Sequence, residues 1–332
     1  MRVFFVPLKE GWIWSSRIVL EFEKYGDKIQ VFEPKNGLIG HVLNMLHMYF
    51  KYLFLASFNK DVKVVISFAS TNGYIASYLP YLTYTLLIQG SDILLEKNDV
   101  RKRTLRALRF AKKVYASSAV EYLNEYSKLN KIPLYLCQKK QWGLNFKDFE
   151  LIDNMLYKHK SVINIAGIRH AREHYCIEES ISLFHLFNQY IKNSKFLYFI
   201  GDASDLDIEI LNTLTKGLVI DIYKSMDRCE FLLTMSQIDI GISLAKSDLF
   251  GGPVLELIAM GGYVVLFENH PLAKLKDKHD LSGILIYEEL EGKNPVLDFS
   301  QEGRKGRSKL AMPFLKGMIF EQSIKELRDE YI

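Results

Sequence analysis

Two carboxylates and a pair of glycines stand together in the segment SDLFGGPVLELIAMGG, where an apolar helix is about to begin. Asp248 and Glu256 lie eight positions apart, and Gly251, Gly252 and Pro253 between them mark a turn that leads into the helix. Glycines at a helix entrance let backbone N–H groups approach a ligand, and the helix N-terminus favours negative charge. The carboxylates suit sugar hydroxyls instead. The segment therefore predicts a ligand that is phosphate at one end and sugar at the other.

The bulk composition is that of a folded globular protein. The 332 residues are 48% hydrophobic and 25% charged, and a chain of this length is expected to form two domains. The 43 basic and 39 acidic residues leave a net charge of +4, too mild to predict a nucleic-acid partner. Three widely spaced cysteines indicate a reducing compartment and no structural zinc. The first apolar run is too short for a signal peptide, so we expect a cytoplasmic protein.

Strand and helix signals alternate through both halves of the chain. Short β-branched or aromatic runs predict strands at 2–8, 27–34, 62–68, 84–90, 112–118, 161–167, 195–201, 216–223, 238–244, 262–268 and 283–289. Their alternation with helical patterns predicts parallel sheets covered on both faces. Residues 137–153 are polar and turn-rich, which predicts a boundary between an N-terminal domain at 1–153 and a C-terminal domain at 154–317.

The segment LIGHVLNMLHMYFKYLFLASF (38–58) has the length of a membrane-spanning helix and is mostly apolar. His41, Asn44, His47 and Lys51 recur at steps of three and four residues, so they share one helix face, and such groups are costly in lipid. We therefore expect an amphipathic helix that packs against the protein, with membrane contact as the alternative.

Several familiar motifs are absent from the sequence. It contains no G-x-G-x-x-G fingerprint and no G-x-x-x-x-G-K-[ST] loop, so dinucleotide dehydrogenases and P-loop proteins lack their usual support. It also contains no G-x-S-x-G elbow and no H-E-x-x-H zinc helix.

The stretch from Asp248 to Glu256, with AMGGYVVLFE after it, resembles the donor-site motif of family 4 retaining glycosyltransferases. Further segments are similar to landmarks of that family in the expected order, namely YGDKIQVF (25–32), IQGSDI (88–93), KKQWGLNFKDFE (139–150), INIAGIRHAR (163–172) and MIFEQSIKELRDEYI (318–332). The resemblance spans nearly the whole chain. It implies an α/β protein of the GT-B fold, with two Rossmann-like doubly wound domains facing across a cleft. A C-terminal helix, about 318–332, would cross back to the first domain.

The resemblance assigns donor-side roles to five residues. Glu256 would hold the nucleotide ribose, because one carboxylate can accept hydrogen bonds from two vicinal hydroxyls. Asp248, where the family usually has Glu, would contact hydroxyls of the donor sugar. Amides at Phe250, Gly251 and Gly252 would meet the sugar-phosphate end. The alternatives are a solvent-facing helix glutamate, a turn-capping aspartate and an ordinary turn.

Two arginines follow the strand expected at 161–167. The resemblance implies that Arg169 and Arg172 stabilise the diphosphate as it leaves, and the alternative for either one is a surface position. The family's Lys has no clear counterpart. His170 and His174 lie nearby, but no carboxylate cluster supports a metal site, and the resemblance implies metal-independent transfer.

The acceptor side would lie in the first domain. Gly11 would let donor and acceptor approach the loop after the first strand, and Asp92 would contact the acceptor or cap the next segment. Gln89 stands where the family usually has His, and its amide cannot act as a general base. In a front-face retaining mechanism the donor phosphate can take the acceptor proton, and Gln89 would orient an acceptor hydroxyl.

A basic stretch precedes the strand expected at 112–118. Its cations are Arg101, Lys102, Arg103, Arg106, Arg109, Lys112 and Lys113. Such a run is usually a solvated face. The alternative is contact with an anionic membrane surface or a lipid-linked acceptor, which the aromatic run YLPYLTY at 78–84 would support.

We therefore expect a retaining hexosyltransferase (EC 2.4 class) that uses a UDP- or GDP-sugar as donor and no metal or other cofactor. Its acceptor would be a glycan or a lipid- or protein-linked group. The protein would be cytoplasmic, with peripheral contact at the inner membrane face as an extension. Two alternatives stay open: a nucleotide-sugar phosphorylase or epimerase, and a catalytically silent GT-B protein that binds a nucleotide, glycan or protein partner.

Overall fold

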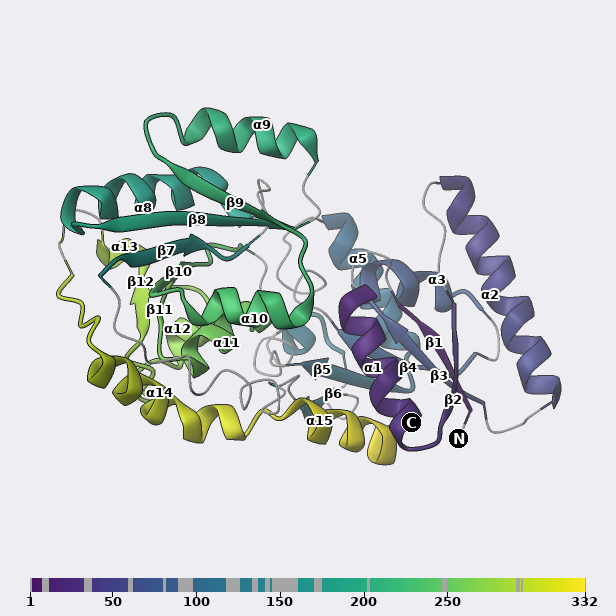
Figure 1. The fold of residues 1–332 in the computed structure, drawn as a ribbon. Helices are drawn as coiled ribbons and strands as arrows, with labels where there is room; N and C mark the ends of the chain where they lie inside the picture. Colours follow the sequence, from purple (N-terminus) through teal and green to yellow (C-terminus); the bar gives the residue numbers. More distant parts are fainter. Residues whose placement is uncertain are drawn as a thin grey trace. The chain divides into compact units, whose positions relative to one another are not determined.

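A computed structural model describes most of the chain. The described residues are 2–7, 12–32, 38–58, 62–79, 82–88, 98–117, 126–132, 137–140, 144, 161–169, 175–201, 204–246, 250–290, 293 and 295–331. The fold consists of two compact units (Figure 1). Unit 1 holds Met1–Trp142 together with Phe320–Ile332, and unit 2 holds Gly143–Ile319.

Unit 1 contains a parallel sheet with strand order β2-β1-β3-β4-β5-β6 among the described residues. The strands are β1 (Arg2–Val6), β2 (Lys28–Val31), β3 (Val62–Ser67), β4 (Thr85–Ile88), β5 (Lys113–Ser117) and β6 (Cys137–Lys140). Helices α1 (Trp12–Lys24) and α15 (Phe320–Glu326) pack on one face through Ile18, Phe22 and Ile324. Helices α2 (Leu38–Phe58), α3 (Tyr74–Ala76) and α5 (Asn98–Phe110) pack on the other. The central strands are apolar because helices bury the sheet on both faces.

Strand β6 corrects the prediction that residues 137–153 are only turn-rich. Cys137 to Lys140 pair in parallel with β5, in the register Val114 with Cys137. β6 is the outermost of the described strands of this sheet, and polar sequences are common in edge strands. A polar edge strand carries no apolar run, so the usual strand signal is missing.

Helix α2 departs from its prediction in one respect. It packs on the sheet through Met48 and Tyr52, as an amphipathic helix should. His47 is exposed, as expected of the polar face, but Leu46 and Phe50 are exposed as well. No helix among the described residues is long and apolar enough to cross a membrane.

Unit 2 repeats the architecture with strand order β12-β11-β10-β7-β8-β9, again parallel throughout its described strands. The strands are β7 (Ile163–Gly167), β8 (Ser194–Gly201), β9 (Ile220–Lys224), β10 (Ile240–Ile242), β11 (Tyr263–Leu266) and β12 (Ile284–Ile286). One face is covered by α8 (Ile177–Tyr190), α9 (Asp205–Leu214) and α13 (Tyr287–Leu290). The other is covered by α10 (Arg228–Ser236), α11 (Gly252–Ala259), α12 (Pro271–Lys274) and α14 (Gln301–Lys316) (Figure 1).

A buried arginine joins α14 to the sheet of unit 2. Arg304 donates from Nη1 to Asp239 Oδ1 at 2.9 Å and from Nε to the Met260 carbonyl at 2.9 Å. Its Nη2 donates to the carbonyls of Ser236 and Ile238 at 3.0 and 2.9 Å. The backbone of Arg304 also lies so close to Gly261, whose φ is +71°, that a Cβ there would fall 2.1 Å from the Arg304 carbonyl oxygen.

The first prediction concerns this arginine. Arg304→Met leaves the Asp239 carboxylate buried without its cation, so the free energy of unfolding should fall by about 3–5 kcal/mol. Urea titration measures the change. Lys309→Met, on an exposed position of the same helix, is the matched control and should have little effect. An Arg304→Met loss no larger than that of the control would contradict the assignment.

Candidate nucleotide-sugar site in unit 2

The strand order of unit 2 fixes where a ligand site can form. The chain runs from β7 outward to β9, then returns to β10 on the other side of β7. Parallel strands end at the same sheet edge, and the reversal of direction between β7 and β10 opens a crevice beyond their carboxyl ends. The segments that follow β7, β10 and β11 therefore meet at one edge.

Arg169 follows β7 at this crevice. Its Nε donates to Ser243 Oγ at 2.9 Å, and Ser243 is a buried residue directly after β10. Burial lowers the pKa of Arg169 to about 10, while its interactions with Tyr175 and Glu256 oppose that shift. The guanidinium thus stays protonated at neutral pH and places a fixed positive charge at the crevice.

Helix α11 presents its N-terminus and its one carboxylate to the same region. Gly251 is the N-cap, with φ −64° and ψ 135°, and Pro253 lies in the first turn. Within the described part of the chain, the structure records no hydrogen-bond partner for the amides of Gly251 and Gly252, which is usual for a first helical turn. The Phe250 side chain packs against Phe314, so only its backbone is available to a ligand.

Glu256, in the middle of α11, is buried although it is charged. Its Oε1 pairs with Arg228 Nη2 at 2.6 Å, and Arg228 begins α10. Its Oε2 is buried and has no hydrogen-bond partner among the described residues. A buried carboxylate oxygen without a donor is costly, and a donor brought by a ligand or by water would satisfy it.

His270 supplies the complementary group. Its Nδ1 accepts from the Leu272 amide at 3.1 Å, which leaves the proton of the neutral ring on Nε2. Nε2 is buried and likewise has no partner in the described part of the protein. Burial lowers the pKa of His270 to about 3, and the charge of Arg169 adds to that shift. The site therefore offers one neutral N–H donor, one carboxylate acceptor and one cation.

The sequence predictions can now be placed on the structure. Arg169, Glu256 and the turn at Phe250, Gly251 and Gly252 are described. The first two lie close enough for their charges to interact. The remaining predicted site residues lie outside the described residues: Arg172 and Asp248 on the donor side, Gly11, Gln89 and Asp92 on the acceptor side, and the neighbouring His170 and His174.

Sequence reasoning missed His270, Arg228 and Ser243. The only signal for His270 was its place directly before Pro271 and shortly after a buried strand, which marks a helix N-cap rather than a ligand site. Arg228 sits in an ordinary helix start after Asp227, and nothing in the sequence links it to Glu256. These residues are recognised as neighbours only once the fold brings the strand ends together.

Comparison with known proteins shows the fold. No protein-family model and no curated protein sequence matches the chain. Sucrose-phosphate synthase from Thermosynechococcus elongatus is similar in structure, with TM-score 0.75, 10% identity, and 100% of this chain and 98% of that chain covered. HepE of Anabaena, in complex with UDP and glucose, gives TM-score 0.74 at 12% identity over 99% and 98% of the two chains. The UDP-GlcNAc 2-epimerase of Neisseria meningitidis, bound to UDP-GlcNAc, gives 0.60 at 12% over 99% of each.

These similarities confirm the expected α/β fold of the GT-B type, with two parallel sheets and their covering helices. Identities of 10–12% establish architecture alone. The activity has to be argued from the residues of this chain.

The second prediction follows from the buried histidine. Between about pH 6.5 and pH 3 the unfolded chain protonates His270 and the folded chain does not, so stability should fall as pH falls below 6.5. The slope contributed by this one group is about 1.4 kcal/mol per pH unit. His270→Asn keeps a side-chain acceptor for the Leu272 amide and removes the titration.

Unfolding by urea at about pH 6.5 and pH 5 measures the effect, in a window above most carboxylate pKa values. His270→Asn should flatten the pH dependence, whereas His185→Asn, at an exposed position of α8, should keep the wild-type slope. Equal slopes in the wild type and His270→Asn would show that His270 is not held neutral.

Proposed function

We propose that the protein is a glycosyltransferase that binds a nucleoside-diphosphate sugar at the β7–β10 crevice of unit 2. The observation that carries the proposal is a pair of buried atoms that lack a hydrogen-bond partner among the described residues, Glu256 Oε2 and His270 Nε2, beside the Arg169 cation. An acceptor suits a ribose hydroxyl, and a donor and a cation suit diphosphate oxygens. The proteins of similar structure that are in complex with UDP and glucose, or with UDP-GlcNAc, support this choice of ligand.

In the proposed complex, Arg228 holds Oε1 of Glu256 and leaves Oε2 to the ribose. The Nε2–H of His270 donates to an oxygen of the sugar phosphate, and the amides at Phe250, Gly251 and Gly252 face the same group. Arg169, held by Ser243, stabilises the negative charge that develops on the diphosphate as the glycosidic bond breaks.

The finer features of the reaction belong to the same proposal. We assign Asp248 to the donor-sugar hydroxyls, Arg172 to the departing diphosphate, and Gly11, Gln89 and Asp92 to the acceptor. Transfer would proceed with retention, the donor phosphate oxygen taking the acceptor proton. Because protein cations neutralise the diphosphate, no metal ion is needed. The acceptor would be a glycan or a lipid- or protein-linked group.

The third prediction tests donor binding. Among UDP, GDP and ADP, one nucleotide should stabilise the protein, by about 2.7 kcal/mol at 100 times its dissociation constant. Glu256→Gln should abolish the shift. The amide has a single accepting oxygen, for which Arg228 and the ribose hydroxyls would then compete. Thermal unfolding, with each variant referred to its own unliganded midpoint, measures the effect.

Glu209→Gln, at an exposed position of α9, is the control and should keep the full shift. A nucleotide shift that survives in Glu256→Gln would remove Glu256 from the site. The absence of any shift in the wild type would remove the nucleotide-sugar assignment itself.

The fourth prediction tests turnover. Proton NMR of the stabilising nucleotide's sugar conjugates, each mixed with a panel of simple sugars as acceptors, should show loss of donor with a product of unchanged anomeric configuration, and chelation of metals should leave the rate unchanged. Arg169→Met should lower the rate about 100-fold or more. Lys309→Met serves as the charge control.

The three candidate activities give different spectra. Inversion at C2 of the bound sugar would identify an epimerase, and formation of a sugar 1-phosphate would identify a phosphorylase. Nucleotide binding without loss of any donor would favour the catalytically silent protein, an alternative that Gln89 supports because its amide cannot act as a base.

A further inference from the structure

The outer face of α2 is apolar and exposed among the described residues. Leu43, Leu46, Phe50, Leu53 and Phe54 are each between 41% and 64% exposed. They recur at steps of three and four residues, so they form a continuous apolar surface along the helix, with Phe54 at its edge toward Gln30. Monomeric soluble proteins seldom expose apolar patches of this size without a partner for them.

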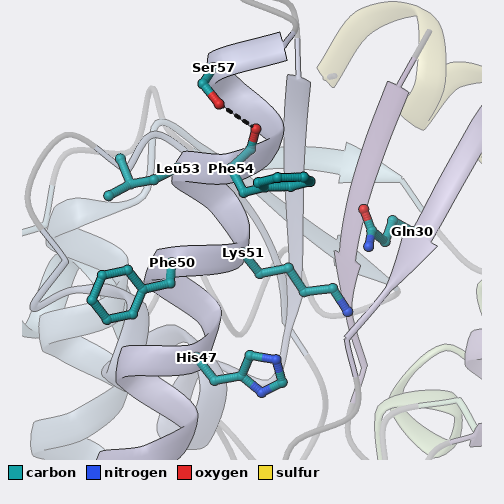
Figure 2. Close-up of a pocket in the computed structure, with 7 residues that line it drawn as sticks. All are labelled: Gln30, His47, Phe50, Lys51, Leu53, Phe54 and Ser57. Carbon is teal, nitrogen blue, oxygen red and sulfur yellow. Dashed lines mark hydrogen bonds between the residues drawn. The ribbon is translucent and has the colours of Figure 1, made fainter.

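A groove beside this surface carries polar groups as well. It has a volume of about 720 Å³ and lies between α2 and Gln30 of β2. Figure 2 shows His47, Lys51 and Phe54 on the side of α2 that faces Gln30, while Phe50 and Leu53 point the other way. Lys51 Nζ lies 5.8 Å from the centre of the Phe32 ring, so its cation stays at the rim of the apolar surface.

The neighbouring helices of the same layer are strongly basic. Helices α2, α3 and α5 all cover the same face of the unit 1 sheet. Their cations are Lys51, Arg101, Lys102, Arg103, Arg106 and Arg109, and their one acidic residue is Asp99. Arg106 stacks over Tyr78 at 3.8 Å, and both Tyr78 and Phe110 are about half exposed. The layer thus combines an apolar helix, amphipathic aromatic rings and an excess of positive charge.

We propose that this α2–α3–α5 face binds the surface of an anionic phospholipid bilayer. Phe50, Phe54 and the leucines would enter the boundary between headgroups and acyl chains, with α2 lying in the plane of the membrane. The arginines and lysines of α5 would attract the anionic headgroups. The inference rests on unit 1 alone and stands whether or not the donor site is correct.

Other occupants fit the face less well. Nucleic acid would match the cations of α5 but leave the apolar surface of α2 in water. A second copy of the chain would bring two basic faces together with only Asp99 on each to oppose them. A bilayer with anionic lipid would bury the apolar residues of α2 and also pair its headgroups with the cations of α5.

The fifth prediction tests this face by co-sedimentation of the full chain with vesicles. Vesicles of phosphatidylcholine with about 30 mol% phosphatidylglycerol should bind the protein at least about tenfold more tightly than pure phosphatidylcholine, and about 0.5 M salt should weaken that binding. Phe50→Ser with Phe54→Ser should reduce it about tenfold or more. Lys102→Glu with Arg109→Glu should do so specifically on anionic vesicles.

Leu206→Ser is the matched control, because Leu206 is 64% exposed on α9 of unit 2, the same fraction as Phe50. It should leave vesicle binding unchanged. Wild-type protein that stays in the supernatant with anionic vesicles would overturn the proposal. So would binding that the Phe50→Ser, Phe54→Ser variant retains, or a dimer in solution that this variant dissociates while vesicles bind neither form.

Discussion

Four hydrogen bonds from one guanidinium join three elements of unit 2, namely α14, α11 and the chain that enters β10. Arg304 ties α14 to the end of α11 through Met260 and to the chain entering β10 through Ser236, Ile238 and Asp239. These bonds anchor the C-terminal end of α11 and the entry to β10, which are the ends of the two elements that lie away from the crevice. A buried arginine is tolerated because all of these acceptors are supplied, three of them by backbone carbonyls that would otherwise be unsatisfied.

The crevice itself has the opposite character. Around Arg304 the buried polar groups satisfy one another, whereas Glu256 Oε2 and His270 Nε2 have no partner among the described residues. An unsatisfied buried group reduces stability, so two of them at one sheet edge indicate a functional role for that edge. Arg169 lies near both groups. The three together provide a donor, an acceptor and a cation, which suit a ligand that is part sugar and part phosphate.

Much of the fold was predictable because parallel strands buried on both faces have to be apolar. Each expected strand overlaps a strand of the structure, and the resemblance around Glu256 located a residue that proves to be buried with an unsatisfied oxygen. Edge strand β6 was missed because its sequence, CQKK, is polar and contains no apolar run. His270 was missed because its importance comes from the strand order β11-β10-β7, which no local sequence pattern records.

The exposed apolar surface of α2 was not predicted from the sequence, for a related reason. Helical periodicity shows that a helix has two faces but does not show which face the sheet covers. The structure packs Met48 and Tyr52 against the sheet and leaves Phe50 in solvent. An amphipathic pattern alone therefore could not distinguish a packing helix from one with an outward apolar face.

The central claim is that unit 2 binds the nucleotide at the β7–β10 crevice. The most direct test is a crystal structure of the protein soaked with UDP and, separately, with GDP. The account predicts ribose hydroxyls on Glu256 Oε2 and diphosphate oxygens beside His270 Nε2 and Arg169. A nucleotide bound elsewhere, with Glu256 Oε2 and His270 Nε2 still lacking partners, would contradict it.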